Sequence, residues 1–92
     1  MYNQFFKGGN IMIKYDKKTQ KILTLNLKDC PSAIEFIEIT NSYQSNFDVI
    51  KNRTDVDGKS ILGVLSLDLS KDIQLIMDKE IDEKAFEKFI KK

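Results

Sequence analysis

Histidine is absent from this 92-residue chain, and the absence excludes a large part of protein chemistry. Imidazole titrates near neutral pH and is a common nucleophile, general base and metal ligand. The single cysteine, Cys30, cannot form an internal disulfide and has no histidine with which to share a metal ion. The sequence therefore predicts no metal centre, no cofactor and no enzymatic activity, and one unpaired thiol fits a reducing cytoplasm.

Long apolar runs are also missing. No segment approaches the roughly 18 consecutive apolar residues of a membrane span, and residues 1–10 lack the apolar stretch of a signal peptide. The formal net charge is only +1, so the chain as a whole gives no electrostatic argument for binding nucleic acid or an anionic membrane. These absences favour a small cytoplasmic protein that forms one domain.

The basic residues are unevenly distributed, since residues 1–28 contain six lysines and one aspartate. We interpret this part as a solvated edge that discourages aggregation, with a weak polyanion-binding tail as the alternative. Residues 1–10 are predicted to form a tail. Phe5 and Phe6 beside Lys7 fit a disordered tail or a strap across the core better than a docking segment for a partner or a membrane.

Alternation of apolar and polar residues predicts several short strands. It is clearest where Leu23, Leu25 and Leu27 alternate with Thr24 and Asn26. The turn predicted over residues 16–19 suggests a hairpin between residues 11–15 and 22–27, although the turn lacks the glycine that favours tight hairpins. Further strands are predicted over residues 47–51 and 54–57 and at Ile73, Leu75 and Met77.

Three segments favour helices. Pro31 suits a first turn and Ser32 an N-cap or first-turn position, which predicts a helix over residues 32–44. A short helix is predicted over residues 60–67, and a last one begins after Asp82, where Ile81 can pack on Phe86. The order β-α-β-β-α-β-α indicates an α+β domain, in which helices cover one face of an antiparallel sheet.

The segment from Asp57 to Leu67 is the most informative stretch of the chain. Ser60 follows Lys59 and opens a short apolar helix, where a phosphate would meet free backbone N–H groups. The simpler interpretation is that Ser60 only caps the helix. A helix this short cannot bury all its apolar residues, so we expect Val64 and Leu67 inside and three residues wholly or partly exposed, as a protein interface. These are Ile61, Leu62 and Leu65.

Residues 59–67 resemble the regulatory serine segment of the HPr family, the histidine-containing phosphocarriers of the bacterial sugar phosphotransferase system. The stretch from Glu35 to Tyr43 is similar to the first helix of that family, and both segments align without a gap. The resemblance covers residues 20–92 and implies an open-faced β-sandwich, with a four-stranded antiparallel sheet under three helices. We therefore predict an HPr-like domain over residues 15–92, preceded by an N-terminal extension over residues 1–14.

The same alignment places residues 29–33 where the family has His-Ala-Arg-Pro-Ala. Asp29 stands at the position of the phosphohistidine, and Pro31 at the position of the arginine that clamps phosphate. The resemblance implies Ser60 as a phosphorylation site for HPr kinase/phosphorylase. It also implies a docking surface for a catabolite-control repressor or phosphotransferase-system enzymes, formed by Lys59, Ile61, Leu62 and Leu65.

Three hypotheses follow. The first is a histidine-lacking regulatory paralogue in carbon metabolism, controlled by phosphorylation of Ser60, that binds proteins and not nucleic acid, membrane or a small-molecule substrate. The second is a scaffold or binding module that is not phosphorylated. The third is a cryptic phosphoryl carrier in which Asp29 forms an acyl phosphate with Lys28 as the only adjacent positive charge. For Asp29, capping the following helix is the simpler interpretation.

Overall fold

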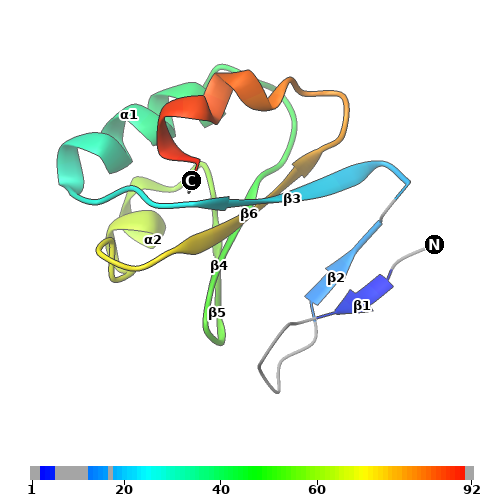
Figure 1. Ribbon diagram of the computed structural model, residues 1–92, viewed down its shortest axis with the longest axis horizontal. Helices are drawn as coiled ribbons and strands as arrows, with labels where there is room; N and C mark the ends of the chain where they lie inside the picture. Colours follow the sequence, from blue (N-terminus) through cyan, green and yellow to red (C-terminus); the bar gives the residue numbers. More distant parts are fainter. Residues whose placement is uncertain (1–2, 6–12, 17, 91–92) are drawn as a thin grey trace.

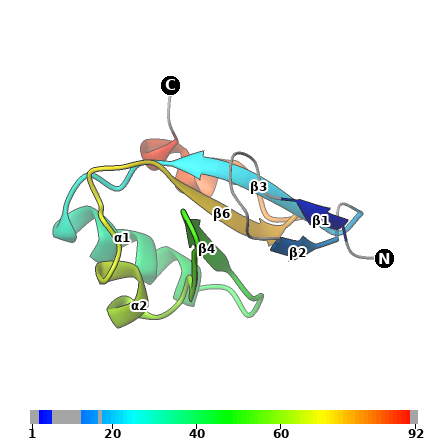
Figure 2. The same ribbon diagram turned by 90° about the horizontal axis from the view of Figure 1, so that it is seen from below.

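The computed structural model describes residues 3–5, 13–16 and 18–90. Its main sheet has four antiparallel strands in the order β3-β6-β4-β5, and three helical segments lie on one face of it (Figures 1 and 2). This arrangement confirms the α+β fold and the open-faced sandwich. The main-domain elements are β3 (Gln20–Leu25), α1 (Cys30–Asn41), β4 (Asp48–Lys51), β5 (Thr54–Asp57), α2 (Ile61–Leu65), β6 (Ile73–Asp78) and the 3-10 helix η1 (Glu83–Phe89).

The strands form where the alternation of apolar residues is regular. In β6, the side chains of Ile73, Leu75 and Met77 are buried against the helices, as the period of two predicts. β6 lies between β3 and β4 in the sheet, so it has ladder partners on both sides. The predicted strands over residues 47–51 and 54–57 correspond to β4 and β5, which are joined by a turn in which Asn52 has a φ of 56°.

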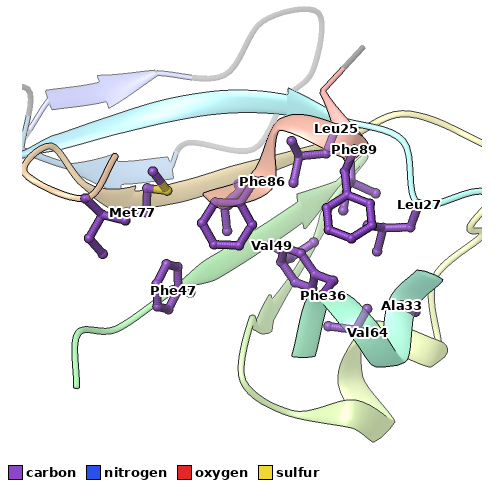
Figure 3. Packing of buried hydrophobic residues seen from close by; sticks show 13 residues of the cluster. Leu25, Leu27, Ala33, Phe36, Phe47, Val49, Val64, Met77, Phe86 and Phe89 are labelled. Atoms are coloured by element: carbon purple, nitrogen blue, oxygen red, sulfur yellow. The ribbon is translucent and has the colours of Figure 1, made fainter. Parts of the chain in front are cut away.

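The core joins the sheet to α1 and η1 through aromatic side chains. The ring of Phe36 in α1 lies 5.6 Å from that of Phe86 and 6.1 Å from that of Phe89, both in η1 (Figure 3). Phe47 completes the cluster, 5.9 Å from Phe86. All four rings are buried. Offset or edge-to-face aromatic pairs contribute about 0.5–1.5 kcal/mol each beyond the area they bury.

α1 and α2 differ from their predicted bounds of 32–44 and 60–67, whereas η1 begins after Asp82, as predicted. α1 begins at Cys30 because Asp29, not Ser32, is the N-cap, and Ser32 takes the alternative first-turn position. α1 ends at Asn41, three residues earlier than predicted, because the following backbone bonds to the last helical carbonyls. The C-terminal helix is a 3-10 helix, in which residues three apart eclipse and both Phe86 and Phe89 reach the core. Its predicted cap, Asp82, accepts a hydrogen bond from the Lys84 N–H.

The N-terminal predictions need correction. Residues 3–5 are not a tail, because Asn3–Phe5 forms β1, which pairs with β2 (Ile13–Tyr15) as a separate two-stranded sheet. The predicted hairpin between residues 11–15 and 22–27 is therefore wrong: β2 pairs with β1, while β3 pairs with β6 over six residues. The predictions for the remainder of residues 1–10, including Phe6 and Lys7, lie outside the described residues.

The sheet face that points away from the helices carries a small apolar cluster and three carboxylates. Ile50 and Ile76 are buried on this face, with Ile22 packed against them. Asp48 lies directly opposite Asp57 in the β4–β5 ladder. Desolvation, with the charges of Asp55 and Asp57, raises the pKa of Asp48, and desolvation likewise raises that of Asp55.

Candidate functional site

Ser60 is the N-cap of α2, as predicted. Its Oγ accepts a hydrogen bond from the Gly63 N–H at 3.2 Å, and its carbonyl accepts one from the Val64 N–H at 3.0 Å. The residue as a whole is half-buried and therefore partly accessible to solvent. Gly63 packs closely here, since a Cβ at this position would lie 3.2 Å from the Cβ of Val56 and 3.4 Å from the Ser60 Oγ.

The backbone before Ser60 is held by the C-terminal end of α1. The buried Thr40 hydroxyl donates to the Gly58 carbonyl at 2.8 Å, and the Asn41 amide donates to the Lys59 carbonyl at 3.2 Å. Gly58 fits tightly, because a Cβ there would lie 2.7 Å from the Cβ of Phe47. The predicted helix over residues 32–44 includes Thr40, but these anchoring contacts were not predicted, and a hydroxyl among the apolar residues of that helix is their only signal in the sequence.

Both the side chain and the backbone N–H of Lys59 form hydrogen bonds with neighbouring residues. Its Nζ donates to the Tyr43 carbonyl at 2.6 Å, just beyond the end of α1, while its backbone N–H donates to the Asp57 carboxylate at 2.9 Å. The side chain is half-buried. The ammonium group therefore stabilises the junction between α1 and the segment before Ser60, and is not directed at the Ser60 hydroxyl as an adjacent counter-charge.

The apolar residues of α2 divide between the core and the surface. Leu62 is 80% exposed and Val64 is fully buried, as predicted. Ile61 and Leu65 are half-buried, which agrees with partial exposure. Leu67 was predicted to be inside and is only half-buried, because it follows the helix and packs at the edge of the core. On α1, which contacts α2, Ile34 is 48% exposed.

Asp29 is exposed and acts as a helix cap. One carboxylate oxygen accepts a hydrogen bond from the Ser32 N–H at 3.0 Å, and this bond is the main reason that the pKa of Asp29 is lowered. A tight turn precedes it: Lys28 has a φ of 71°, and the Asp29 N–H donates to the Leu27 carbonyl at 2.8 Å. The structure thus confirms the capping interpretation of Asp29.

The described residues contain no group of three or more side chains suited to hold a metal ion. Cys30 is a free and exposed thiol. Within the same described ranges, no helix has the length and apolar character needed to cross a membrane. The site residues predicted from the sequence therefore fall into two places, with Lys59, Ser60, Ile61, Leu62 and Leu65 at α2 and Asp29 at the start of α1.

Comparisons with known proteins identify the family. The family model described as PTS HPr component phosphorylation site matches residues 31–91. A crystal structure of HPr-C-His from Thermoanaerobacter tengcongensis has the same fold, with a TM-score of 0.57, 24% identity and coverage of 73% of this chain and 83% of that chain. The phosphocarrier protein HPr from Bacillus anthracis str. Ames is similar, with a TM-score of 0.54, 25% identity and coverage of 75% and 88%.

A comparison with curated proteins gave no match. The family match nevertheless covers well over half of the chain and includes α1, α2, β6 and η1. It also agrees with the resemblance drawn from residues 59–67 and with the observed order of strands. The chain belongs to the HPr family of the phosphotransferase system, whose members are phosphocarrier proteins and not enzymes.

Proposed function

We propose that this protein is a regulatory HPr-like protein of bacterial carbon metabolism that has lost phosphohistidine chemistry. In this proposal it acts in the cytoplasm by docking to other proteins, and phosphorylation of Ser60 controls the docking. The observation that carries the proposal is a partly accessible Ser60 at the N-cap of α2, two residues before the 80%-exposed Leu62, in a chain of this family without histidine.

Asp29 and Pro31 are the two residues that would make this protein unable to carry a phosphoryl group. A phosphoryl carrier needs a nucleophile that accepts the group and a cation that neutralises its oxygens. At the position of the family histidine, the Asp29 carboxylate is held by the Ser32 N–H, and Pro31 provides no cation. Lys28 is the adjacent positive charge. Capping α1 therefore accounts for Asp29 without any phosphoryl transfer.

Phosphorylation of Ser60 would change the surface more than the fold. A phosphoserine has about −1.5 to −2 charges at pH 7 and three acceptor oxygens. The Gly63 N–H, which already donates to the Ser60 Oγ, remains available to a phosphate oxygen at that place. The Lys59 Nζ donates one hydrogen bond to the Tyr43 carbonyl, so pairing with the phosphate would use its other N–H groups or replace that bond. Val64 is fully buried, so a phosphate on the surface at Ser60 is expected to leave its core contacts unchanged.

The proposed docking surface comprises Lys59, Ile61, Leu62 and Leu65. Leu62 exposes most of its side chain to water, so covering it with a partner would gain roughly 1.5–3 kcal/mol. The partners proposed by resemblance are HPr kinase/phosphorylase and a catabolite-control repressor or enzymes of the phosphotransferase system. Residues 15–92 are proposed as the HPr-like domain, which contains the matched residues 31–91, with residues 1–14 as an extension.

The test is incubation with HPr kinase and ATP, followed by measurement of the intact mass. We expect one phosphate on the parent protein and none on Ser60→Ala. The matched control is Ser66→Ala, which removes the other serine hydroxyl bonded within α2, where its Oγ donates to the Gly63 carbonyl. This variant should be phosphorylated like the parent.

No phosphate on the folded parent, or equal phosphorylation of Ser60→Ala, would contradict the proposal. The first result would favour the unphosphorylated scaffold. Binding of the phosphorylated protein to the repressor should then be weaker in Leu62→Asp, because a charge replaces the exposed apolar contact. If Leu62→Asp binds like the parent, α2 is not the docking surface.

A further inference from the structure

A hollow in the protein surface lies away from α2, beside η1. η1 ends beside the end of β3, where the Asn26 N–H donates to the Phe89 carbonyl at 2.8 Å and Leu25 forms a bridge with Ile90 (Figure 1). The hollow has a volume of about 700 Å³ and opens between η1 and residues 26–28. This volume falls in the range of sites that hold small molecules, about 300–1,000 Å³.

The lining of the hollow has an apolar part and a basic part. Ala85 and Ile90, both half-buried, provide the apolar part, while the Phe89 ring lies in the core against Phe36. Three lysines and one glutamate provide the charged part: Lys28, Lys84, Lys88 and Glu87. The formal charge of the lining is therefore about +2 at neutral pH, since lysine and glutamate are both ionised there.

The three lysines that line the hollow differ in the hydrogen bonds and ion pairs that their side chains form. Lys88 forms an ion pair with Glu35 of α1. The structure shows no side-chain hydrogen bond or ion pair for Lys28 or Lys84 with any described residue, and both residues are exposed. Lys28 is fixed in position by its backbone, because its N–H donates to the Leu69 carbonyl at 3.0 Å. Lys28 and Lys84 thus line one hollow from separate elements, and the carboxylate next to Lys28 is that of Asp29, which caps α1.

We propose that this hollow binds a small phosphomonoester non-covalently, with its phosphate between Lys28 and Lys84 and its remainder against Ala85 and Ile90. A phosphomonoester has a charge of about −1.5 to −2 at pH 7, which matches the lining. A monocarboxylate has only one negative charge, so it would leave the lining with excess positive charge. The site is separate from Ser60 and needs no covalent step, so it does not depend on the proposed function.

The experiment is a titration of the full chain with phenyl phosphate, followed by the ¹H–¹⁵N spectrum. We expect saturable shifts at residues 26–28 and 84–90, and tighter binding than for inorganic phosphate, which lacks the apolar part. Lys84→Gln should weaken binding about two- to fivefold, the effect of one exposed charge contact. Glu87→Gln and Glu35→Gln should strengthen binding, since the first removes a repelling charge and the second frees Lys88.

Lys51→Gln is the matched control, because it makes the same charge change outside the hollow and should leave binding unchanged. The proposal is overturned if phenyl phosphate causes no saturable shifts, or if Lys84→Gln and Lys51→Gln weaken binding equally. It is also overturned if an acidic hexapeptide saturates residues 26–28 and 84–90 while phenyl phosphate does not, since the hollow would then be a protein-docking site.

Discussion

Replacing Thr40 by valine removes one buried hydroxyl and leaves the volume of the side chain nearly unchanged. Thr40 is fully buried, and its Oγ1 lies 2.8 Å from the Gly58 carbonyl and 3.1 Å from the Ile37 carbonyl. A hydroxyl has one hydrogen, and the shorter distance assigns it mainly to Gly58. In the valine variant, the carbonyl of the buried Gly58 loses this donor.

Leaving a buried acceptor without its donor costs about 1–3 kcal/mol. A loss of about 2 kcal/mol would lower Tm by roughly 8–16 °C in a domain of this size. Thr40→Ser keeps the donor and loses one methyl group, so it should cost only about 1 kcal/mol. Thr40→Ala loses both and leaves a cavity, so it should be the least stable of the three.

Thermal and urea unfolding of the three variants measures this order directly. We also expect faster amide hydrogen exchange at Lys59 and Gly63 in Thr40→Val than in Thr40→Ser, because the segment before Ser60 loses its anchor to α1. A valine variant as stable as the parent, or more stable than the serine variant, would refute the argument that Thr40 holds the Gly58 carbonyl.

Three further predictions concern the core, the sheet and the last helix. Val64→Asp should abolish cooperative unfolding, because it buries an unpaired charge. Leu62→Asp on the same helix should have the same melting curve as the parent. If the two variants melted alike, the buried and exposed sides of α2 would be assigned wrongly. Asp48→Asn should raise stability at pH 7 by about 0.5 kcal/mol, since Asp48 faces Asp57 across the ladder. The pKa of Asp48 is raised from its ordinary 3.8 in the folded state, so the fold loses stability as pH rises from 3.8 through this raised pKa and Asp48 ionises. The gain from Asp48→Asn should therefore vanish at pH 3, where the carboxyl is protonated. Glu80→Gln is the control. Asp82→Ala should cost about 1 kcal/mol through the lost cap on the Lys84 N–H, and an unchanged Tm would argue against that cap.

Much of the fold was predictable because its signals are local. The alternation of Ile73, Leu75 and Met77 indicates a strand buried on one face, and Asp82 followed by an apolar stripe indicates the start of a helix. The start of α1 was less certain, because Asp29 and Ser32 can each cap a helix. What favours Asp29 is the turn at Lys28, whose N–H bonds to the distant Leu69 carbonyl.

Strand pairing was not predictable in the same way. β3 pairs with β6, which lies about fifty residues later in the chain, and local alternation does not say which strand a segment joins. The predicted hairpin between residues 11–15 and 22–27 failed for this reason. The predicted turn does form, since the N–H groups of Thr19 and Gln20 both donate to the Asp16 carbonyl.

The candidate site likewise has features that the local sequence predicts and contacts that depend on how distant segments pack. Ser60 as a cap and Leu62 as an exposed residue follow from the spacing within one short helix. The anchoring by Thr40 and Asn41, and the engagement of Lys59 with Tyr43, depend on how α1 lies against the segment before α2. These contacts join residues 16 to 18 positions apart, which no local pattern specifies.

The proposed function requires that this member of the HPr family does not accept a phosphate at Asp29, where we propose that the family histidine is missing. Incubation with Enzyme I and phosphoenolpyruvate, followed by measurement of the intact mass, tests this most directly. The mass should stay unchanged, while an ordinary HPr in the same tube gains a phosphate. A hydroxylamine-sensitive phosphate on the parent protein that is absent from Asp29→Ala would contradict the account and establish Asp29 as a carrier.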